Sequence, residues 1–360
     1  MQEFRIAVPD AALDDLDRRL DATILPEPTP GVDWSRGIPP AVLGELVARW
    51  RDRFDWRAHE RRLNGYGQRL VEVDGCTVHA LVVRGGRPGR LPVVVTHGWP
   101  YSFVSMLALA ERLRGELDVV IPSLPGYGYS DVLPVPFTGS AVAARWHGLM
   151  EALGYPRYLT YGEDVGAEVS DWLAATRPGA VAGIVASHAS FSARDRPGVE
   201  LSDEERAFLR SVAPPAESGY AHQQGTRPDT LAAALIDSPS GLLAWIAEKV
   251  AVWSDGEGLE RIDTDDLLLN VAVYWFTRSI GTSFRPYAEG DAQEGPHPLI
   301  EVPASILIQR HEAGYPRSLA EKTYTDIRAF ERLEAGGHFT AWEAPERVAA
   351  AIMSLEAEVR

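Results

Sequence analysis

The segment YLTYGEDVGAEVSDWLAA, residues 158–175, has the outline of a nucleophile elbow with an aspartate at its apex. Such an elbow joins a strand to a helix through a tight turn and lifts its central side chain above the sheet edge. Gly162 and Gly166 flank Asp164 with the spacing G-x-D-x-G, where a serine is expected at the centre. A carboxylate with an ordinary pKa of about 3.9 is ionised at pH 7. Toward a saturated carbon with a strained or good leaving group, it can displace that group and form an alkyl ester.

Hydrolysis of such an ester requires a base, and His338 in EAGGHFTAWE is the candidate. Glu312, which follows the apolar strand in SILIQRH, would orient this histidine. A positioned base contributes roughly 10²–10⁴-fold to the rate. Asp326 and Asp291 are alternative acids, but neither follows an apolar strand as closely. Nucleophile, acid and histidine then have the chain order of α/β-hydrolases.

The segment LPVVVTHGWP, residues 91–100, is a second apolar strand that ends in a turn. Attack of water on the ester creates an oxyanion, which needs backbone N–H donors worth roughly 10²–10³-fold each. We expect the amides of Trp99 and Val165 to supply them. All these pieces follow predicted strands, and open α/β sheets bind ligands at the carboxyl ends of their strands.

Each candidate also has a structural explanation when it is considered alone. An aspartate at a strand–helix turn is often only an N-cap, His338 could be a hydrogen-bonded structural histidine, and Glu312 a solvated loop residue. Their order and their shared position at strand ends favour catalysis. Glu163 would raise the pKa of Asp164 if it pointed into the pocket, but we expect it to face away. Ser170 falls inside the helix after the elbow, which argues against a serine esterase.

Helical periodicity dominates the first part of the chain. Residues 9–23 predict a helix with Asp10 as its N-cap, and a second amphipathic helix covers residues 39–54. A short helix follows near residues 56–63. The period then changes, and residues 69–83 predict two strands joined by a turn at Asp74-Gly75.

From residue 91 onward, strands and helices alternate, which indicates a mostly parallel α/β sheet flanked by helices. The alternation stops after about residue 190 for a helical stretch rich in Trp, Tyr and Pro, and resumes in VPASILIQR. A closing helix is predicted in AWEAPERVAAAIMSLEAEV. The predicted organisation is an N-terminal helical segment (1–66), a core in two parts (67–189 and 301–360) and a helical lid (190–300).

Composition excludes several classes of protein. The 360 residues carry a formal net charge of −16 and a pI of about 5.0, which argues against nucleic acid or an anionic membrane as partner. Cys76 is the sole cysteine, so neither a disulfide framework nor a cysteine metal site is expected. No apolar run approaches the roughly 20 residues of a membrane span, and the N-terminus lacks a signal-peptide pattern. We expect a cytoplasmic protein without metal or cofactor.

The longer motifs resemble the microsomal-type epoxide hydrolases, which include the juvenile-hormone epoxide hydrolases. These motifs are HGWP, the G-x-D-x-G elbow, SGYAHQQGTRPDTLAAALIDSPSGLLAWI, SFRPYAE and GGHFTAWEAPE, and the resemblance runs over nearly the whole chain. It implies an α/β-hydrolase fold with a helical lid and an N-terminal helical segment.

The resemblance also implies roles for individual residues. Asp164 would be the nucleophile, His338 the base and Glu312 its charge partner. Tyr220 in SGYAH and Tyr287 in FRPYAE match the two lid tyrosines that hydrogen-bond the epoxide oxygen. Trp99 would give the oxyanion amide and pack its indole against the substrate pocket.

One departure from the family bears on the competing hypotheses. Many family elbows carry a tryptophan directly after the nucleophile, where this chain has Val165. Haloalkane dehalogenases commonly use that tryptophan to bind halide, so its absence weakens a haloalkane or haloacid dehalogenase as the alternative. A catalytically silent hydrolase-fold binding protein is the third hypothesis.

We predict an epoxide hydrolase that uses water to convert a small-molecule epoxide, aryl or from secondary metabolism, into a vicinal diol. Aromatic lid residues would suit a bulky substrate: Trp245, Trp253, Tyr274, Trp275 and Phe276. No residue pattern specifies the oligomeric state, and a homodimer is retained as a hypothesis.

Overall fold

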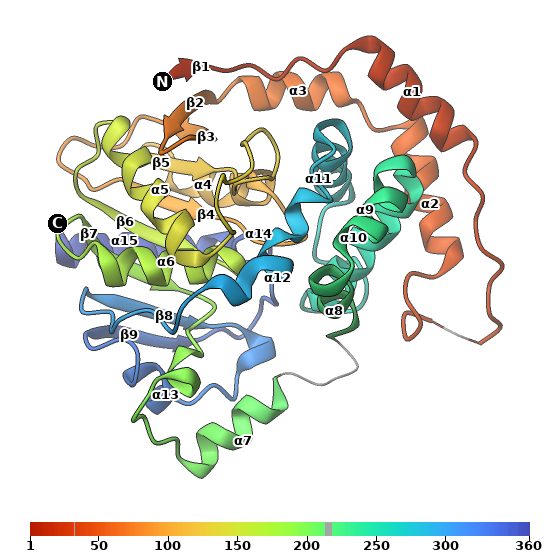
Figure 1. Ribbon diagram of the computed structural model, residues 1–360. Helices are drawn as coiled ribbons and strands as arrows, with labels where there is room; N and C mark the ends of the chain where they lie inside the picture. Colours follow the sequence, from red (N-terminus) through yellow and green to blue (C-terminus); the bar gives the residue numbers. More distant parts are fainter. Residues whose placement is uncertain (32, 213–217) are drawn as a thin grey trace.

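The computed structural model describes residues 1–31, 33–212 and 218–360 (Figure 1). Within these ranges, nine strands form one sheet with the order β1-β2-β3-β5-β4-β6-β7-β8-β9. The strands are β1 (Gln2–Glu3), β2 (Gly67–Val73), β3 (Cys76–Val83), β4 (Val93–Thr96), β5 (Val119–Pro122), β6 (Tyr158–Gly162), β7 (Val181–Ala186), β8 (Ala304–Ile308) and β9 (Ile327–Arg332).

The sheet is parallel from β5 to β9 and antiparallel from β1 through β3 to β5. The predicted turn at Asp74-Gly75 is confirmed, because Val73 pairs with Cys76 and both turn residues have positive φ. Strands β4 to β8 are buried along their whole length, as expected of strands covered on both faces. The predicted α/β-hydrolase fold class is confirmed, with β1 and β9 as strands that the sequence did not indicate.

Two pairs of helices cover the sheet. Helices α5 (Gly139–Ala152) and α6 (Val165–Thr176) contact each other, and α15 (Pro345–Val359) contacts α4 (Leu107–Leu113), β7 and β8. Shorter helices lie in the loops: η1 (Phe103–Met106), η2 (Ser192–Asp195), η4 (Thr282–Phe284), η5 (Gly290–Ala292), η6 (Arg310–Glu312), α13 (Arg317–Glu321) and α14 (Thr340–Glu343).

The three predicted N-terminal helices are present as α1 (Asp10–Asp21), α2 (Pro40–Asp52) and α3 (Trp56–Asn64). Asp10 was wrongly predicted as the N-cap of α1. Pro9 holds that position with an extended backbone, and Asp10 is the first helical residue. The Asp10 carboxylate pairs with Arg57 of α3 instead of capping the helix.

The helical stretch between β7 and β8, here called the helical insertion, contains α7 (Asp203–Ser211), α8 (Gly219–Thr226), α9 (Pro228–Asp237), α10 (Pro239–Trp253), α11 (Thr264–Thr277) and α12 (Arg285–Glu289). Figure 1 shows α1 and α2 along the outer side of α9 and α10, and α10 contacts both N-terminal helices. Among the described residues, three ion pairs join the N-terminal helices to the helical insertion: Arg19–Asp237 at 2.9 Å, Arg49–Asp265 at 2.8 Å and Arg62–Asp266 at 3.3 Å.

No single helix in the described ranges has the length and hydropathy to cross a bilayer. Helices α9 and α10 meet those two criteria only as a pair bent by 118°.

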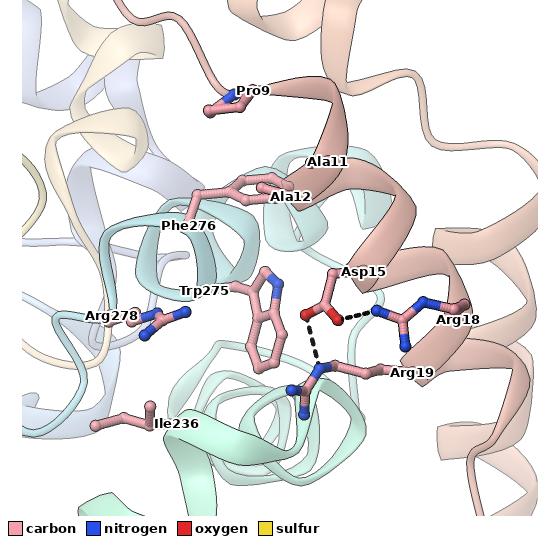
Figure 2. A pocket seen from close by; sticks show the side chains of 10 residues that line it. All are labelled: Pro9, Ala11, Ala12, Asp15, Arg18, Arg19, Ile236, Trp275, Phe276 and Arg278. Carbon is pink, nitrogen blue, oxygen red and sulfur yellow. Dashed lines mark hydrogen bonds and ion pairs between the residues drawn. The ribbon is translucent and has the colours of Figure 1, made fainter.

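A surface pocket of about 600 Å³ lies between α1 and the ends of α9 and α11 (Figure 2). Trp275 and Phe276 form part of its wall, and Asp15 bridges Arg18 and Arg19 beside them. Trp275 and Phe276, expected among the substrate-facing aromatics, therefore line a pocket that contains none of the candidate catalytic residues.

Candidate active site

Asp164 occupies the turn between β6 and α6 with φ 53° and ψ −124°. Its side chain makes no capping hydrogen bond to α6, so the N-cap explanation does not apply. A non-glycine residue in such a conformation costs about 1–3 kcal/mol and persists where its surroundings enforce it. Glycine is required on both sides, because a Cβ on Gly162 would lie 2.0 Å from the carbonyl oxygen of Gly166. A Cβ on Gly166 would lie 2.4 Å from the Thr96 oxygen.

Parallel pairing brings the loop after β4 to the elbow. Thr96 at the end of β4 pairs with Gly162 at the end of β6. The backbone N–H of Trp99 donates to Oδ1 of Asp164 at 2.9 Å, and the N–H of Val165 lies close enough to this carboxylate to help lower its pKa. Gly98 lies so close that a Cβ there would stand 2.5 Å from Cβ of Asp164. Both predicted oxyanion donors therefore face the Asp164 carboxylate.

His338 lies in the loop between β9 and α14, with Nε2 3.4 Å from Oδ2 of Asp164. Its backbone N–H donates to the carbonyl of Trp253 at the end of α10, at 2.9 Å. Burial alone would lower the pKa of His338, but the close contact with the Asp164 carboxylate and its negative charge outweigh burial, and the pKa is raised. Burial would raise the pKa of Asp164, but His338 and the Trp99 and Val165 amides hold it below its ordinary value.

Glu312, in η6 after β8, lines the same cavities as His338. Burial raises its pKa, and its charge favours the protonated form of His338. Among the hydrogen bonds of the described residues, however, none joins Glu312 to His338, and Oε2 of Glu312 has no partner. Of the two alternative acids, Asp291 lines the cavity that contains Asp164. Asp326 precedes β9 and therefore lies at the opposite end of the strands.

Tyr220 of α8 and Tyr287 of α12 pack around the indole of Trp99. The Tyr220 ring stacks on it at 5.3 Å between centroids, and the Tyr287 ring meets it edge-on at 5.7 Å. The two tyrosine rings are 5.7 Å apart. Burial, reinforced by the charge of Asp164, raises the pKa of both phenols well above 10, so both are protonated at neutral pH.

Two cavities reach His338 and Glu312. One of about 720 Å³ contains Asp164 and runs between α6, the loop after β7 and residues 290–297. The other, of about 550 Å³, is lined by Tyr220 and Trp253. Of the five lid aromatics expected to face the substrate, Trp253 lines a cavity together with His338. Two other expected aromatics are engaged elsewhere, since Tyr274 donates to the carbonyl of Tyr101 and Trp245 to Gln224.

Two residues beside the site gave no clear signal in the sequence. Glu163 is fully buried, and its carboxylate accepts hydrogen bonds from the Tyr161 hydroxyl and from the backbone N–H of Ala341. Burial raises its pKa to about 7. It lines neither cavity, in keeping with the expectation that it faces away from the pocket. His188, two residues after β7, hydrogen-bonds the backbones of Asp164 and His338. Its position at the end of a strand is the one sequence feature that could have indicated it.

Comparisons with known proteins bear on the family and the fold of this chain. Residues 1–106 match the family described as "Epoxide hydrolase N terminus", and residues 92–213 match the "alpha/beta hydrolase fold" family. A Stigmatella aurantiaca protein named "Putative epoxide hydrolase" is 37% identical over 95% of this chain and 81% of that relative. Juvenile hormone epoxide hydrolase 2 of Ctenocephalides felis is 30% identical over 98% of this chain and 85% of that relative. The crystal structure of juvenile hormone epoxide hydrolase from Bombyx mori superposes with a TM-score of 0.87, at 28% identity, over 100% of this chain and 94% of that one.

Proposed function

Because this chain belongs to the epoxide hydrolases of the α/β-hydrolase fold, we propose that it opens its substrate through a covalent ester on Asp164. Enzymes of this class add water to small-molecule epoxides. The single observation that carries the covalent mechanism is a carboxylate at the apex of the elbow, with a histidine 3.4 Å away.

In the first step, one carboxylate oxygen of Asp164 attacks an epoxide carbon. The carbon–oxygen bond of the ring breaks, and the departing oxygen takes a proton from the phenol of Tyr220 or Tyr287. Both phenols are protonated at neutral pH and pack against Trp99, whose amide bonds Asp164. This geometry supports their assignment as donors to the epoxide oxygen.

In the second step, His338 removes a proton from water, and the hydroxide adds to the ester carbonyl of Asp164. Negative charge collects on the oxygen that faces the N–H groups of Trp99 and Val165. These donors stand in place before charge develops, which is the condition for strong electrostatic stabilisation. Collapse expels the alkoxide of the diol, which takes the proton from His338. The carboxylic acid left on Asp164 then gives its proton to the tyrosinate formed in the first step, so the carboxylate and the phenol are both restored.

Glu312 and the helical insertion complete the proposal. The Glu312 charge favours the imidazolium that forms in the second step. We further propose that residues 190–300 act as the lid, since α8 and α12 carry the two tyrosines and α10 ends at Trp253. The homodimer, the cytoplasmic location and an aryl or secondary-metabolite epoxide as substrate stay predictions.

Trapping the ester tests the mechanism. The variant His338→Gln is incubated with styrene oxide and, separately, with 1-bromobutane, and its intact mass is measured. We expect a mass gain equal to the whole epoxide, absent from the double variant Asp164→Ala/His338→Gln. An adduct formed only from the bromoalkane, with the halide lost, would instead make the enzyme a dehalogenase. No adduct with either probe, while the wild type turns over styrene oxide, would contradict covalent catalysis.

A further inference from the structure

His188 joins the backbones of the two loops that carry the nucleophile and the base. It follows β7, which pairs in parallel with β6, and Ala186 stands beside Gly162. Parallel strands bring their following loops to one edge of the sheet, so His188 lies next to the elbow. The ring of His188 also packs against that of His338, with centroids 4.6 Å apart and planes at 72°.

Both ring nitrogens of His188 make hydrogen bonds. Nδ1 accepts from the backbone N–H of Asp164 at 3.2 Å, and Nε2 donates to the backbone carbonyl of His338 at 2.8 Å. One state of the ring satisfies both contacts, namely the neutral form with its proton on Nε2. A protonated ring could not accept from Asp164.

The surroundings keep His188 in that neutral form. Burial, and then the positive charge of His338, lower its pKa to about 3. The charge of Asp164 and the hydrogen bond to the His338 carbonyl both raise the pKa of His188, but neither outweighs burial. The ring therefore presents one acceptor and one donor throughout the pH range in which His338 titrates.

We propose that His188 is a positioning residue that holds the strained elbow of Asp164 and the loop of His338 in fixed relation. The inference rests on the proposed roles of those two residues. The N–H of Asp164 belongs to a residue with φ 53°, so a partner for that N–H stabilises an otherwise disfavoured turn. The same ring fixes the carbonyl of His338 and so the direction from which Nε2 approaches Asp164.

The proposal predicts a difference between two substitutions of His188. In His188→Gln, the side-chain amide can still accept from Asp164 and donate to His338. In His188→Leu, the side chain has a volume similar to that of histidine but can make neither hydrogen bond. Because misplacement of reacting groups by about 1 Å can cost 10²-fold in rate, we expect His188→Leu to slow ester formation by roughly 10–100-fold. His188→Gln should recover most of this loss.

The experiment measures the rate of ester formation by intact mass in the His338→Gln background with styrene oxide. His188→Leu and His188→Gln are compared there, with His59→Leu as the matched control, because His59 stacks on Phe54 and lines neither catalytic cavity. An unchanged rate of ester formation in His188→Leu, or an equal loss of rate in both His188 variants, would overturn the inference. If the His338→Gln variant alone forms no ester with styrene oxide, the proposed covalent mechanism is wrong instead.

A second measurement does not depend on the folding of any variant. Nitrogen-15 NMR of the wild-type histidines should show His188 neutral, with its proton on Nε2, from pH 5 to 8. Titration of His188 within that range, or the opposite tautomer, would contradict the proposal.

Discussion

Nε2 of His338 and Oδ2 of Asp164 are 3.4 Å apart, so the proposed base and the proposed nucleophile already form an ion pair before substrate binds. The negative charge of Asp164 is what raises the pKa of His338 against the effect of burial. Ester formation replaces that carboxylate by a neutral group, while burial remains. In the proposed mechanism, the first chemical step would therefore shift His338 toward the neutral form that the second step requires.

This coupling predicts the effect of Asp164→Asn on His338. Removing the carboxylate charge leaves burial as the dominant influence, so the pKa of His338 should fall below its wild-type value. His338 would then be neutral at pH values where the wild-type residue is still protonated. NMR titration of the histidine ring in both proteins measures the shift. An equal or higher pKa in the variant would contradict the assigned cause.

The two tyrosines should contribute to ester formation. We expect Tyr220→Phe and Tyr287→Phe each to slow this step by roughly 10–100-fold, and the double variant to lose more, since general acids contribute about 10²–10⁴-fold. Single-turnover kinetics with styrene oxide separate this step from ester hydrolysis. Tyr66→Phe is the control, because that phenol bonds Glu111 at the surface. A double variant as fast as the wild type would remove both residues from the mechanism.

Glu312 should affect mainly the second step. We expect Glu312→Gln to slow ester hydrolysis about tenfold or more and to leave ester formation within about twofold. Rapid-quench measurement of both steps on one epoxide tests this division. The matched variant is Glu163→Gln, because the charge of Glu163, like those of Asp164 and Glu312, raises the pKa of His338. A larger hydrolytic loss in Glu163→Gln than in Glu312→Gln would transfer the charge-partner role to Glu163.

Gly98→Ala should displace the nucleophile. The added methyl group would lie 2.5 Å from Cβ and 2.6 Å from Oδ1 of Asp164, well inside contact distance. We expect ester formation to fall by about 10²-fold or more. Gly179→Ala serves as control, since nothing lies within 4 Å of its added Cβ. If Gly98→Ala formed the ester at the wild-type rate, the loop that carries Trp99 would have to accommodate the methyl group without displacing Asp164.

A buried ion pair at the far side of the core makes a stability prediction. Glu356 of α15 is fully buried, pairs with Arg90 and accepts from the backbone N–H of Leu91, just before β4. Removing one partner of a buried pair costs about 3–5 kcal/mol when the other charge is left uncompensated, and because Arg90 would keep Glu116 at 3.8 Å we expect a loss of about 3 kcal/mol. Glu356→Ala should lower the free energy of unfolding by that amount in denaturant titration. Exposed Glu358→Ala should change it little, and an equal effect of both would refute the argument.

The sequence predicted the elbow well because its geometry depends on local features. Two glycines with no room for a side chain frame Asp164, and the spacing alone reveals them. The edge strand β9 was missed because its side chains are partly or fully exposed and it lacks an apolar run. Tyr220 and Tyr287 are far from the elbow in sequence, and only the family resemblance suggested them.

Contacts between distant loops escaped prediction for a related reason. His188 bonds Asp164 and His338 through single backbone groups, which leave no periodic pattern. The prediction of Asp10 as an N-cap was wrong because its carboxylate pairs with Arg57, which is distant in the sequence. Glu312 was expected from chain order to orient His338, yet order alone does not fix the distance between two loops, and no hydrogen bond among the described residues joins the two side chains.

The three ion pairs between the N-terminal helices and the helical insertion bear on how this enzyme can be re-engineered. Arg19, Arg49 and Arg62 each hold an aspartate that lies more than two hundred residues later in the chain. A chimaera that imports the insertion of a relative, but keeps residues 1–66, would leave these arginines facing unmatched side chains. Segments 1–66 and 190–300 should therefore be exchanged together, from the same relative.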